Sequence, residues 1–426
     1  YNKDIDPKVT EDALFNYAKL SYEVSFDPYN RSISAFQDFL KRYPNSAKPD
    51  EVYGYMLEVF MSSKNYDAAL EAIEKIEHKN LKLKSAYQLI AYNKGTEEYQ
   101  NRMYDQAQRY YDKSLNYPVD KKLSALTYYW KGEAYYRTRS YDSSITAYKT
   151  FIFEPEAILL PVFNQVNYNL GYAYYKQGEF DEANKWFRKF AYSKKQEDSL
   201  KINDAYLRIG DGFFISKKYY DAVDFYSEAE QMQKLDVDYA LFQQALCLAI
   251  LKKPSQQVGK LEKLIAQYPN SSYADASRYQ LGRAYTVQDE KEKALQAYAS
   301  LLTENPNSVF VKKARINTGL LYFNMGNDDK ALEVFNKIIT DYPNLEDTKE
   351  ALAAVKAIYL DRGDIVAYTS LVEGLSFLDV SKSELDSTIF EAASLKYFEN
   401  ACQAAIRDLK TYLEKFPKPL FGLDAN

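Results

Sequence analysis

The residue types that carry out most enzyme chemistry are sparse in this chain, and their spacing favours no active site. The only histidine, His78, lies in the polar segment 77–80. A histidine metal cluster needs at least a second histidine, and a lone histidine in a turn does not predict a Ser/His/Asp or Cys/His nucleophile. The two cysteines, Cys247 and Cys402, are far apart in the sequence, so we expect no disulfide between them.

Paired carboxylates, another common catalytic device, occur at Asp328/Asp329 and at Asp361/Asp364. Both pairs lie in segments with turn character, where acidic side chains typically cap the next helix. An acid–base pair also needs at least one buried carboxyl group with a shifted pKa. The Gly-Asp-Gly segment at 210–212 is not followed by a phosphate-binding signature. We therefore predict that the chain is not an enzyme and that it holds no cofactor and no metal.

Tyrosine is the unusual component, with 42 of the 426 residues. A tyrosine joins a large apolar ring to a polar tip, so it can pack between helices while its hydroxyl reaches water. We expect most of these rings to serve in packing and a minority to line a binding surface.

Charge and hydropathy exclude several classes of partner. The formal net charge is -5 and the isoelectric point is near 5.4. No long basic run is present, so we do not expect nucleic acid or an anionic membrane surface as the main partner. No apolar stretch approaches the ~20 residues of a membrane-spanning helix.

A unit of two helical stretches joined by a short turn recurs about eleven times, returning every 36 to 39 residues. In each unit a small residue on the first stretch is followed, about twelve positions later, by a small residue near the start of the second. Two antiparallel helices approach closely where neither carries a bulky side chain. The clearest pairs are Gly132/Ser144, Gly171/Ala183, Gly210/Ala222, Gly282/Ala294 and Gly319/Ala331.

Large residues, helix-capping residues and prolines complete the unit. An aromatic or aliphatic residue follows three positions after the first small residue, and another large residue follows four positions after the second. Polar residues such as Asn65 and Asn327 precede the second stretch as candidate helix caps. Prolines such as Pro269 and Pro343 follow it, and the residue before a proline is disfavoured in a helix.

This pattern resembles the tetratricopeptide repeat, and the resemblance covers nearly the whole chain. It implies an all-α fold, an α-α superhelix in the form of a right-handed solenoid of about eleven helix pairs. It also implies a non-catalytic scaffold that binds a protein or peptide. Repeats ending in Tyr-Pro-Asn-Ser further resemble bacterial cell-envelope proteins, and the tyrosine content resembles repeat proteins of Bacteroidetes. These likenesses imply the periplasm or the outer membrane as the location, with the cytoplasm left open.

Copies that depart from the pattern suggest how the chain is divided. The copy at 236–272 has Leu246 and Val258 at the two small positions and Pro254 in its turn, and the copy at 347–379 keeps only a turn. Either place could bend the superhelix, and the second is the softer candidate. We expect an array of nine to ten repeats over 1–363, an irregular joint over 364–387, and the last repeat with the start of a truncated following repeat over 388–426.

The last helical stretch carries apolar residues with little behind them to cover them. These residues are Ile406, Leu409, Leu413 and Phe416. Terminal repeats normally carry a polar capping face. We therefore expect a partner, self-association or a continuation of the array at this C-terminal edge.

In tetratricopeptide proteins the first helices line the concave face, so the resemblance implies where a ligand binds. The implied positions lie three before, one after and four after the first small residue. They include Glu133, Leu207 and Asp211, and the aromatic members imply a groove for an extended or helical peptide. The alternative is that the rings pack across adjacent first helices. The implied peptide-binding residues are Tyr129, Tyr136, Tyr168, Tyr172, Tyr175 and Phe214.

The family's clamp for C-terminal carboxylates is incomplete here. Tyr279 and Arg283 replace its first Lys–Asn pair, and Ala353 replaces its Arg. We therefore infer no binding of chaperone tails and expect at most a weaker, salt-sensitive site for an acidic group. The residues of that site are Arg283, Lys313, Asn317 and Lys349.

A protein or peptide partner in the concave groove is the leading functional hypothesis. The alternative is a carbohydrate or peptidoglycan-associated binding protein, similar to helical nutrient-uptake lipoproteins of Bacteroidetes. Those proteins carry their sugar platform on long loops that interrupt the repeats. This chain has no such insertion and only two tryptophans, Trp130 and Trp186, at regular repeat positions.

Overall fold

The computed structural model describes residues 6–24, 28–62, 65–76, 78–193, 198–375 and 382–426. All regular secondary structure in these ranges is helical, which confirms the predicted all-α class. The chain forms two compact units, residues 1–235 and residues 236–426.

Unit 1 contains twelve α-helices and two short 3₁₀ segments within the ranges just given. The helices are α1 (Pro7–Val24), α2 (Pro28–Arg42), α3 (Pro49–Ser62), α4 (Tyr66–Glu74), α5 (Leu81–Gln100), α6 (Tyr104–Leu115), α7 (Lys121–Arg137), α8 (Tyr141–Phe153), η1 (Ala157–Leu159), η2 (Pro161–Phe163), α9 (Gln165–Gln177), α10 (Phe180–Ala191), α11 (Ser199–Ile215) and α12 (Tyr219–Met232).

Unit 2 continues the same alternation of first and second helices. Its helices are α13 (Val237–Ile250), α14 (Pro254–Gln267), α15 (Ala274–Val287), α16 (Lys291–Glu304), α17 (Val311–Asn324), α18 (Asp328–Asp341), α19 (Leu345–Arg362), α20 (Ile365–Glu373), α21 (Lys382–Phe398), α22 (Cys402–Lys415) and α23 (Gly422–Ala425).

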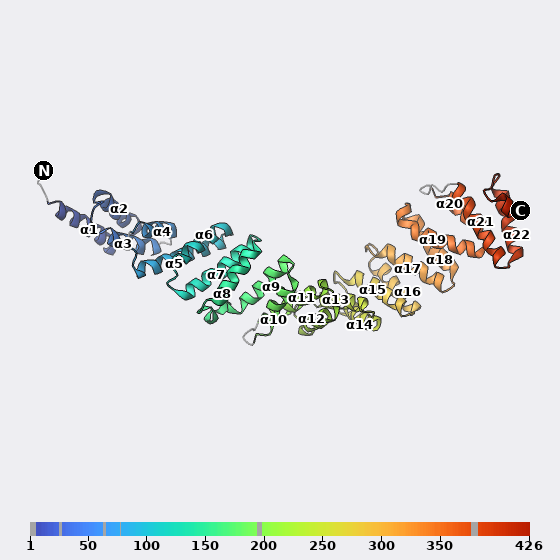
Figure 1. Cartoon of the computed structure of the whole chain (residues 1–426), viewed down its shortest axis with the longest axis horizontal. Helices are drawn as coiled ribbons and strands as arrows, with labels where there is room; N and C mark the ends of the chain where they lie inside the picture. The colour runs from blue at the N-terminus through green and yellow to red at the C-terminus, as the bar shows by residue number, and fades with distance from the viewer. Residues whose placement is uncertain (1–5, 25–27, 63–64, 77, 194–197, 376–381) are drawn as a thin grey trace. The chain divides into compact units, whose positions relative to one another are not determined.

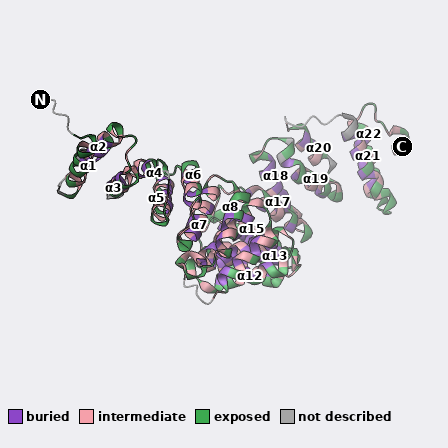
Figure 2. Cartoon of the chain, turned by 60° about the vertical axis from the view of Figure 1, so that its left-hand side comes forward, coloured by how far each residue is buried: buried purple, intermediate pink, exposed green. Residues whose placement is uncertain are grey.

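Within each unit, consecutive helices pair into hairpins that follow one another in chain order (Figure 1). From α1/α2 to α21/α22 the described helices make eleven such pairs, as the repeat predicted. In unit 1 each hairpin packs on the next, and in unit 2 the hairpins from α13/α14 to α19/α20 do the same. First helices of neighbouring hairpins also meet, as α5 meets α7 and α15 meets α17. The buried residues therefore lie along the faces between adjacent helices rather than in one central core (Figure 2).

Glycine lets the two helices of a hairpin approach, as the spacing predicted, but its main contact is an aromatic ring. A Cβ atom added to Gly282 would lie 2.4 Å from Cε1 of Tyr298. The ring therefore occupies the space that a side chain would fill. The same contact, always sixteen positions apart, recurs in six hairpins: Gly95/Tyr111, Gly132/Tyr148, Gly171/Phe187, Gly210/Tyr226, Gly282/Tyr298 and Gly319/Phe335.

The turn between the two helices of a hairpin uses one left-handed residue, two positions before the second helix begins. Gly178 has φ 83°, and Arg139 takes the same conformation with φ 61°. The sequence predicted the turns but not this conformation at non-glycine residues. The residues with positive φ at this place are Arg102, Arg139, Gly178, Lys217, Lys252, Asp289, Gly326, Gly363 and Asn400.

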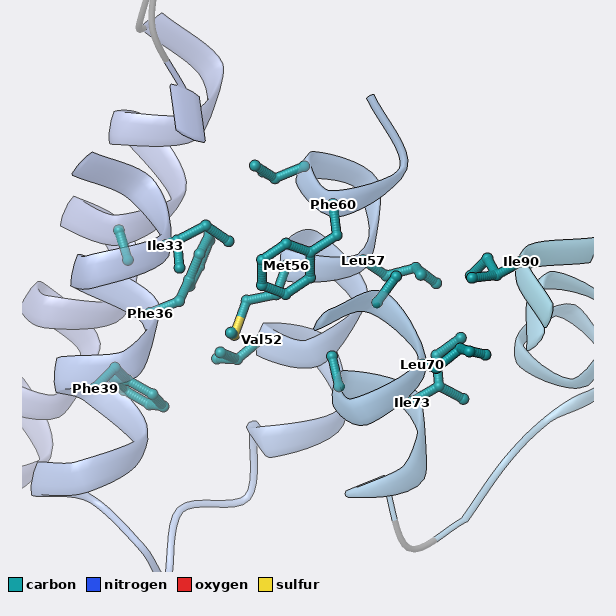
Figure 3. Packing of buried hydrophobic residues seen from close by; sticks show 14 of the residues in the cluster. Ile33, Phe36, Phe39, Val52, Met56, Leu57, Phe60, Leu70, Ile73 and Ile90 are labelled. Carbon is teal, nitrogen blue, oxygen red and sulfur yellow. The ribbon is translucent and has the colours of Figure 1, made fainter. Parts of the chain in front are cut away.

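The first three hairpins show how side chains from successive helices make the core. Phe36 of α2 belongs to the same cluster of buried residues as Met56 and Phe60 of α3, which face α2 (Figure 3). On the other side of α3, Leu57 belongs to the same cluster of buried residues as Ile90 of α5. One cluster thus links three hairpins, because each helix contributes to two neighbouring interfaces.

The two degenerate copies are more regular than the sequence suggested. Pro254 is the first residue of α14, a position where the missing N–H has no helical partner in any case. Helix α20 lies within the stretch 364–387, and the carboxylate of Asp364 accepts a hydrogen bond of 3.1 Å from the N–H of Ala367. The expected irregular structure is therefore corrected for residues 365–373 and, at the start of α21, for residues 382–387. Residues 376–381 lie outside the described residues, so a joint there stays a prediction.

At the C-terminal edge, α23 folds back on the last hairpin. The ring of Phe421 stacks on Phe390 at 4.6 Å, and the N–H of Leu420 donates to Asp386 at 3.1 Å. Ile406 is still 49% exposed, whereas Leu413 is half-buried. The edge is thus partly covered by the chain itself, and a partner there stays a prediction.

Candidate functional site

A pocket of about 190 Å³ opens in unit 1 where α7, α8 and α9 meet. A first helix, its second helix and the next first helix each contribute side chains, because α8 packs on both α7 and α9. The lining residues are Glu133, Tyr136, Arg137, Tyr148, Tyr168, Asn169 and Tyr172.

Glu133 is the hydrogen-bonding centre of this pocket. Its Oε1 accepts from the hydroxyl of Tyr148 at 2.5 Å and from the amide of Asn169. Its Oε2 has only a long contact of 3.5 Å with the hydroxyl of Tyr99. Burial raises the pKa of the Glu133 carboxyl, and the Tyr148 hydrogen bond and the positive charge of Arg137 oppose this shift without cancelling it.

Tyr168 and Tyr172 form an aromatic corner on α9. Their rings are 5.0 Å apart and inclined at 70°. Both hydroxyls donate to Oδ2 of Asp204 on α11, the Tyr168 bond being 2.7 Å long. Because one carboxylate oxygen holds both phenols, the orientation of the two rings is fixed from the next repeat.

The network continues through charged residues on α11. Arg208 donates to Asp204 at 3.3 Å and to Asp211 at 2.5 Å. Asp211 is buried and also accepts from the hydroxyl of Tyr226 at 2.8 Å. The negative charge of Asp211 is therefore balanced within the protein.

The polarity of the residue that follows each close-approach glycine depends on whether a tyrosine or a phenylalanine ring covers that glycine. Where the ring is a tyrosine, the following residue is polar or charged; where it is a phenylalanine, the following residue is aromatic or aliphatic. This rule explains Glu133 and Asp211 as partners of a buried hydroxyl. The following residues are Thr96, Glu133, Asp211 and Arg283 for tyrosine rings, and Tyr172 and Leu320 for phenylalanine rings.

In addition to Asp211, two residues of unit 1 expected on the exposed concave face are buried. Tyr129 is 6% exposed and packs against Phe151, with ring centroids 5.7 Å apart. Leu207 is fully buried. Both side chains are therefore packing residues rather than exposed groove residues, and the ring of Tyr129 packs on α8, the second helix of its own hairpin.

Three other expected groove residues are half-buried and close the hairpin turns. Each stacks edge-to-face on the aromatic residue that begins the second helix of its own hairpin. The same contact joins Tyr99 to Tyr104 in the hairpin before them. The three pairs are Tyr136 with Tyr141 at 5.5 Å, Tyr175 with Phe180 at 5.3 Å and Phe214 with Tyr219 at 5.7 Å.

Sequence reasoning missed Asn169 and Asp204, although the repeat carried a signal for the first. Asn169 lies two residues before Gly171, and its amide donates to Tyr129 of the preceding repeat at 3.3 Å. In unit 2, Asn317 occupies the same place before Gly319. An asparagine at this position, with a tyrosine in the preceding repeat, therefore indicates a hydrogen bond that joins the two repeats.

The expected acid-binding residues in unit 2 separate into two kinds. The amide of Asn317 donates to the hydroxyl of Tyr298 at 3.1 Å and contacts that of Tyr279 at 3.5 Å, so it is occupied by packing residues. Arg283 is exposed on α15, Lys313 on α17 and Lys349 on α19. No contact recorded among the described residues joins these three cations to one another, and a site made by them stays a prediction.

Neither a metal-binding cluster nor a membrane-spanning helix is found among the described residues. Within them, no three His, Cys, Asp or Glu side chains gather in a way that could hold a metal ion. None of their helices combines the length and apolar character needed to cross a membrane.

Two models of the tetratricopeptide repeat match the chain. One matches residues 92–157 and 131–199, and the other matches residues 12–46, 239–271, 276–308 and 313–345. Together these segments cover more than half of the chain. Among curated proteins, none matches.

Solved structures of other repeat proteins are similar in fold. YrrB, described as a tetratricopeptide protein with an unusual peptide-binding site, shares 21% identity over 50% of this chain and 99% of its own, with a TM-score of 0.39. The C-terminal part of a tetratricopeptide protein from Cytophaga hutchinsonii shares 15% identity over 62% and 98%, with a TM-score of 0.42. MamA from Desulfovibrio magneticus shares 18% over 42% and 93%, with a TM-score of 0.35.

Proposed function

Because the chain belongs to the tetratricopeptide repeat family of protein-interaction scaffolds, we propose that unit 1 binds a peptide segment of a partner protein. The binding site is the pocket between α7 and α9 with the half-buried rings beside it. The observation that carries the proposal is the corner of Tyr168 and Tyr172, held open toward the pocket by Asp204.

The aromatic side chains suit this role because they are already ordered. A tyrosine offers a large contact area and loses little entropy when its ring is fixed before binding. Tyr136 lines the same pocket from α7, while Tyr175 on α9 and Phe214 on α11 hold the equivalent positions in the next two hairpins. A peptide lying across successive first helices would meet these rings in turn.

Panning random peptides on the immobilised full chain tests the proposal. We expect the selected peptides to lose binding to Tyr172→Ala and to retain it with Tyr220→Ala, which removes an exposed ring on the second helix α12. Far-UV circular dichroism checks that both variants keep their helices. Selected peptides that bind Tyr172→Ala as well as the wild type would place the site elsewhere.

A glycan array run in parallel addresses the carbohydrate alternative. Binding of peptidoglycan fragments that depends on Tyr172, with no peptide selected, would replace the proposed function. The bacterial cell envelope stays our prediction for the cellular setting, and it is supported by composition alone.

A further inference from the structure

The carboxylate of Glu133 is half-buried in the pocket, yet no basic side chain of the described residues forms an ion pair with it. Three buried acids have cations: Lys94 pairs with Glu98, Arg208 with Asp211 and Lys396 with Asp408. Asp386 is also buried, and its donors are neutral: the hydroxyl of Tyr412 and the N–H of Leu420. Glu133 instead receives neutral donors on Oε1 and one long contact on Oε2. Like Asp386, Glu133 has no ion pair among the described residues, and Glu133 lines a pocket.

Arg137 is the nearest candidate counterion, and it does not fill this role completely. Its Nε donates to the hydroxyl of Tyr99 at 3.4 Å. Its positive charge lowers the pKa of Glu133, but burial outweighs it and the pKa is raised overall. Arg137 therefore lines the pocket without forming an ion pair with Glu133.

The walls of the pocket carry the second property that a cation site needs. The faces of aromatic rings attract cations, most strongly when water is excluded. Tyr168 and Tyr172 meet nearly at right angles, and Tyr136 comes from the facing helix. The volume of about 190 Å³ is several times the ~30 Å³ share of one water molecule, so it accommodates the end of a long side chain.

We infer that this pocket binds a cationic side chain, an arginine or lysine of the bound segment, between the tyrosine rings and the carboxylate of Glu133. The inference deepens the proposed function and rests on it. Arginine is the better ligand of the two, because its planar guanidinium stacks on rings and donates two bonds to a carboxylate.

Saturation-transfer NMR on the full chain tests the site with two small probes, N-acetylarginine methylamide and N-acetylcitrulline methylamide. The probes have nearly the same shape, and only the first is charged. We expect the arginine probe to bind about tenfold more tightly, and Glu133→Gln to reduce it to the level of the citrulline probe. Glu304→Gln, an exposed glutamate in unit 2, serves as the matched control and leaves both probes unchanged.

Arg137→Gln provides a test in the opposite direction. Removing the like charge beside the pocket should strengthen binding of the arginine probe by roughly threefold, whereas loss of a merely structural residue would weaken it. Equal binding of the two probes, or full binding to Glu133→Gln, would overturn the cation site.

The peptide selection separates this result from the proposed function. Selected peptides that depend on Tyr172 but lack arginine and lysine would leave the groove in place and refute the cation site. A selection that yields no groove-dependent peptide would refute the groove, whatever the arginine probe shows.

Discussion

Many tyrosines in this chain are explained by a carboxylate within reach of the hydroxyl. A buried phenol needs a hydrogen-bond partner, and an acidic side chain on a neighbouring helix supplies a strong one. Examples outside the candidate site are Tyr87 with Glu74 at 2.8 Å and Tyr412 with Asp386 at 2.6 Å. Each such pair fixes a large ring between two helices, so the tyrosine content serves mainly the contacts within and between repeats.

The raised pKa of Glu133 predicts how stability depends on pH. Ionising a carboxyl whose pKa is raised by folding lowers the stability of the folded state. The stabilising contribution of protonated Glu133 is therefore complete at a pH below its ordinary pKa of 4.5, and it is lost as the pH rises through the raised pKa of the folded protein. We expect Glu133→Gln, which keeps an acceptor for Tyr148, to gain stability relative to the wild type over that window. Urea unfolding midpoints between acidic and neutral pH measure this change.

If the difference in stability between Glu133→Gln and the wild type stayed constant across this pH range, the prediction would be contradicted. The control is Glu304→Gln, which should follow the wild type at every pH because Glu304 is exposed.

Two glycines in unit 2 should respond oppositely to the same substitution. A Cβ on Gly282 collides with Tyr298, so Gly282→Ala should destabilise by about 1–3 kcal/mol through overpacking. Gly259, inside α14, has no neighbouring atom within 4 Å, so Gly259→Ala should stabilise by about 0.5–1 kcal/mol. Chemical denaturation of both variants measures the difference, and equal effects would contradict the assigned packing.

At the scale of the element, the backbone conformation of the hairpin turn is the same whichever residue type stands there. In the hairpins whose turns the structure describes, the second helix begins two residues after a left-handed residue, whether this is glycine, arginine, lysine, aspartate or asparagine. The geometry of two packed helices imposes this conformation, so it overrides the local preference of the residue that stands there.

We therefore expect Arg139→Gly to stabilise the protein by about 1 kcal/mol and Gly178→Ala to destabilise it by a similar amount. No atom lies within 4 Å of a Cβ at Gly178, so its cost is conformational rather than steric. Thermal unfolding of both variants tests this expectation. Arg139→Ala controls for the lost charge, and a gain from that variant equal to that of Arg139→Gly would refute the backbone explanation.

At the scale of the whole molecule, stability in a repeat array is a sum over neighbouring hairpins. The contacts group into residues 1–235 and 236–426. We expect each fragment, expressed alone, to be helical and to unfold cooperatively. Gly282→Ala should then lower the unfolding temperature of the second fragment by an amount close to its effect in the full chain, and an unfolded second fragment would contradict this division.

The sequence by itself determined the all-α class, the helix pairs and the close approach at glycines such as Gly132 and Gly171. These features follow from periodicity, because one face of every helix must be buried against its neighbours in chain order. The sequence also placed Tyr168 and Tyr172 on one face of one helix.

Only the tertiary structure decided what surrounds those side chains. It buried Tyr129, paired Asn317 with tyrosine hydroxyls, and brought Asp204 from the next repeat onto the hydroxyls of α9. It also left Glu133 in a pocket without an ion pair. Burial and hydrogen-bond partners depend on residues about one repeat away, and the spacing within a single repeat does not contain that information.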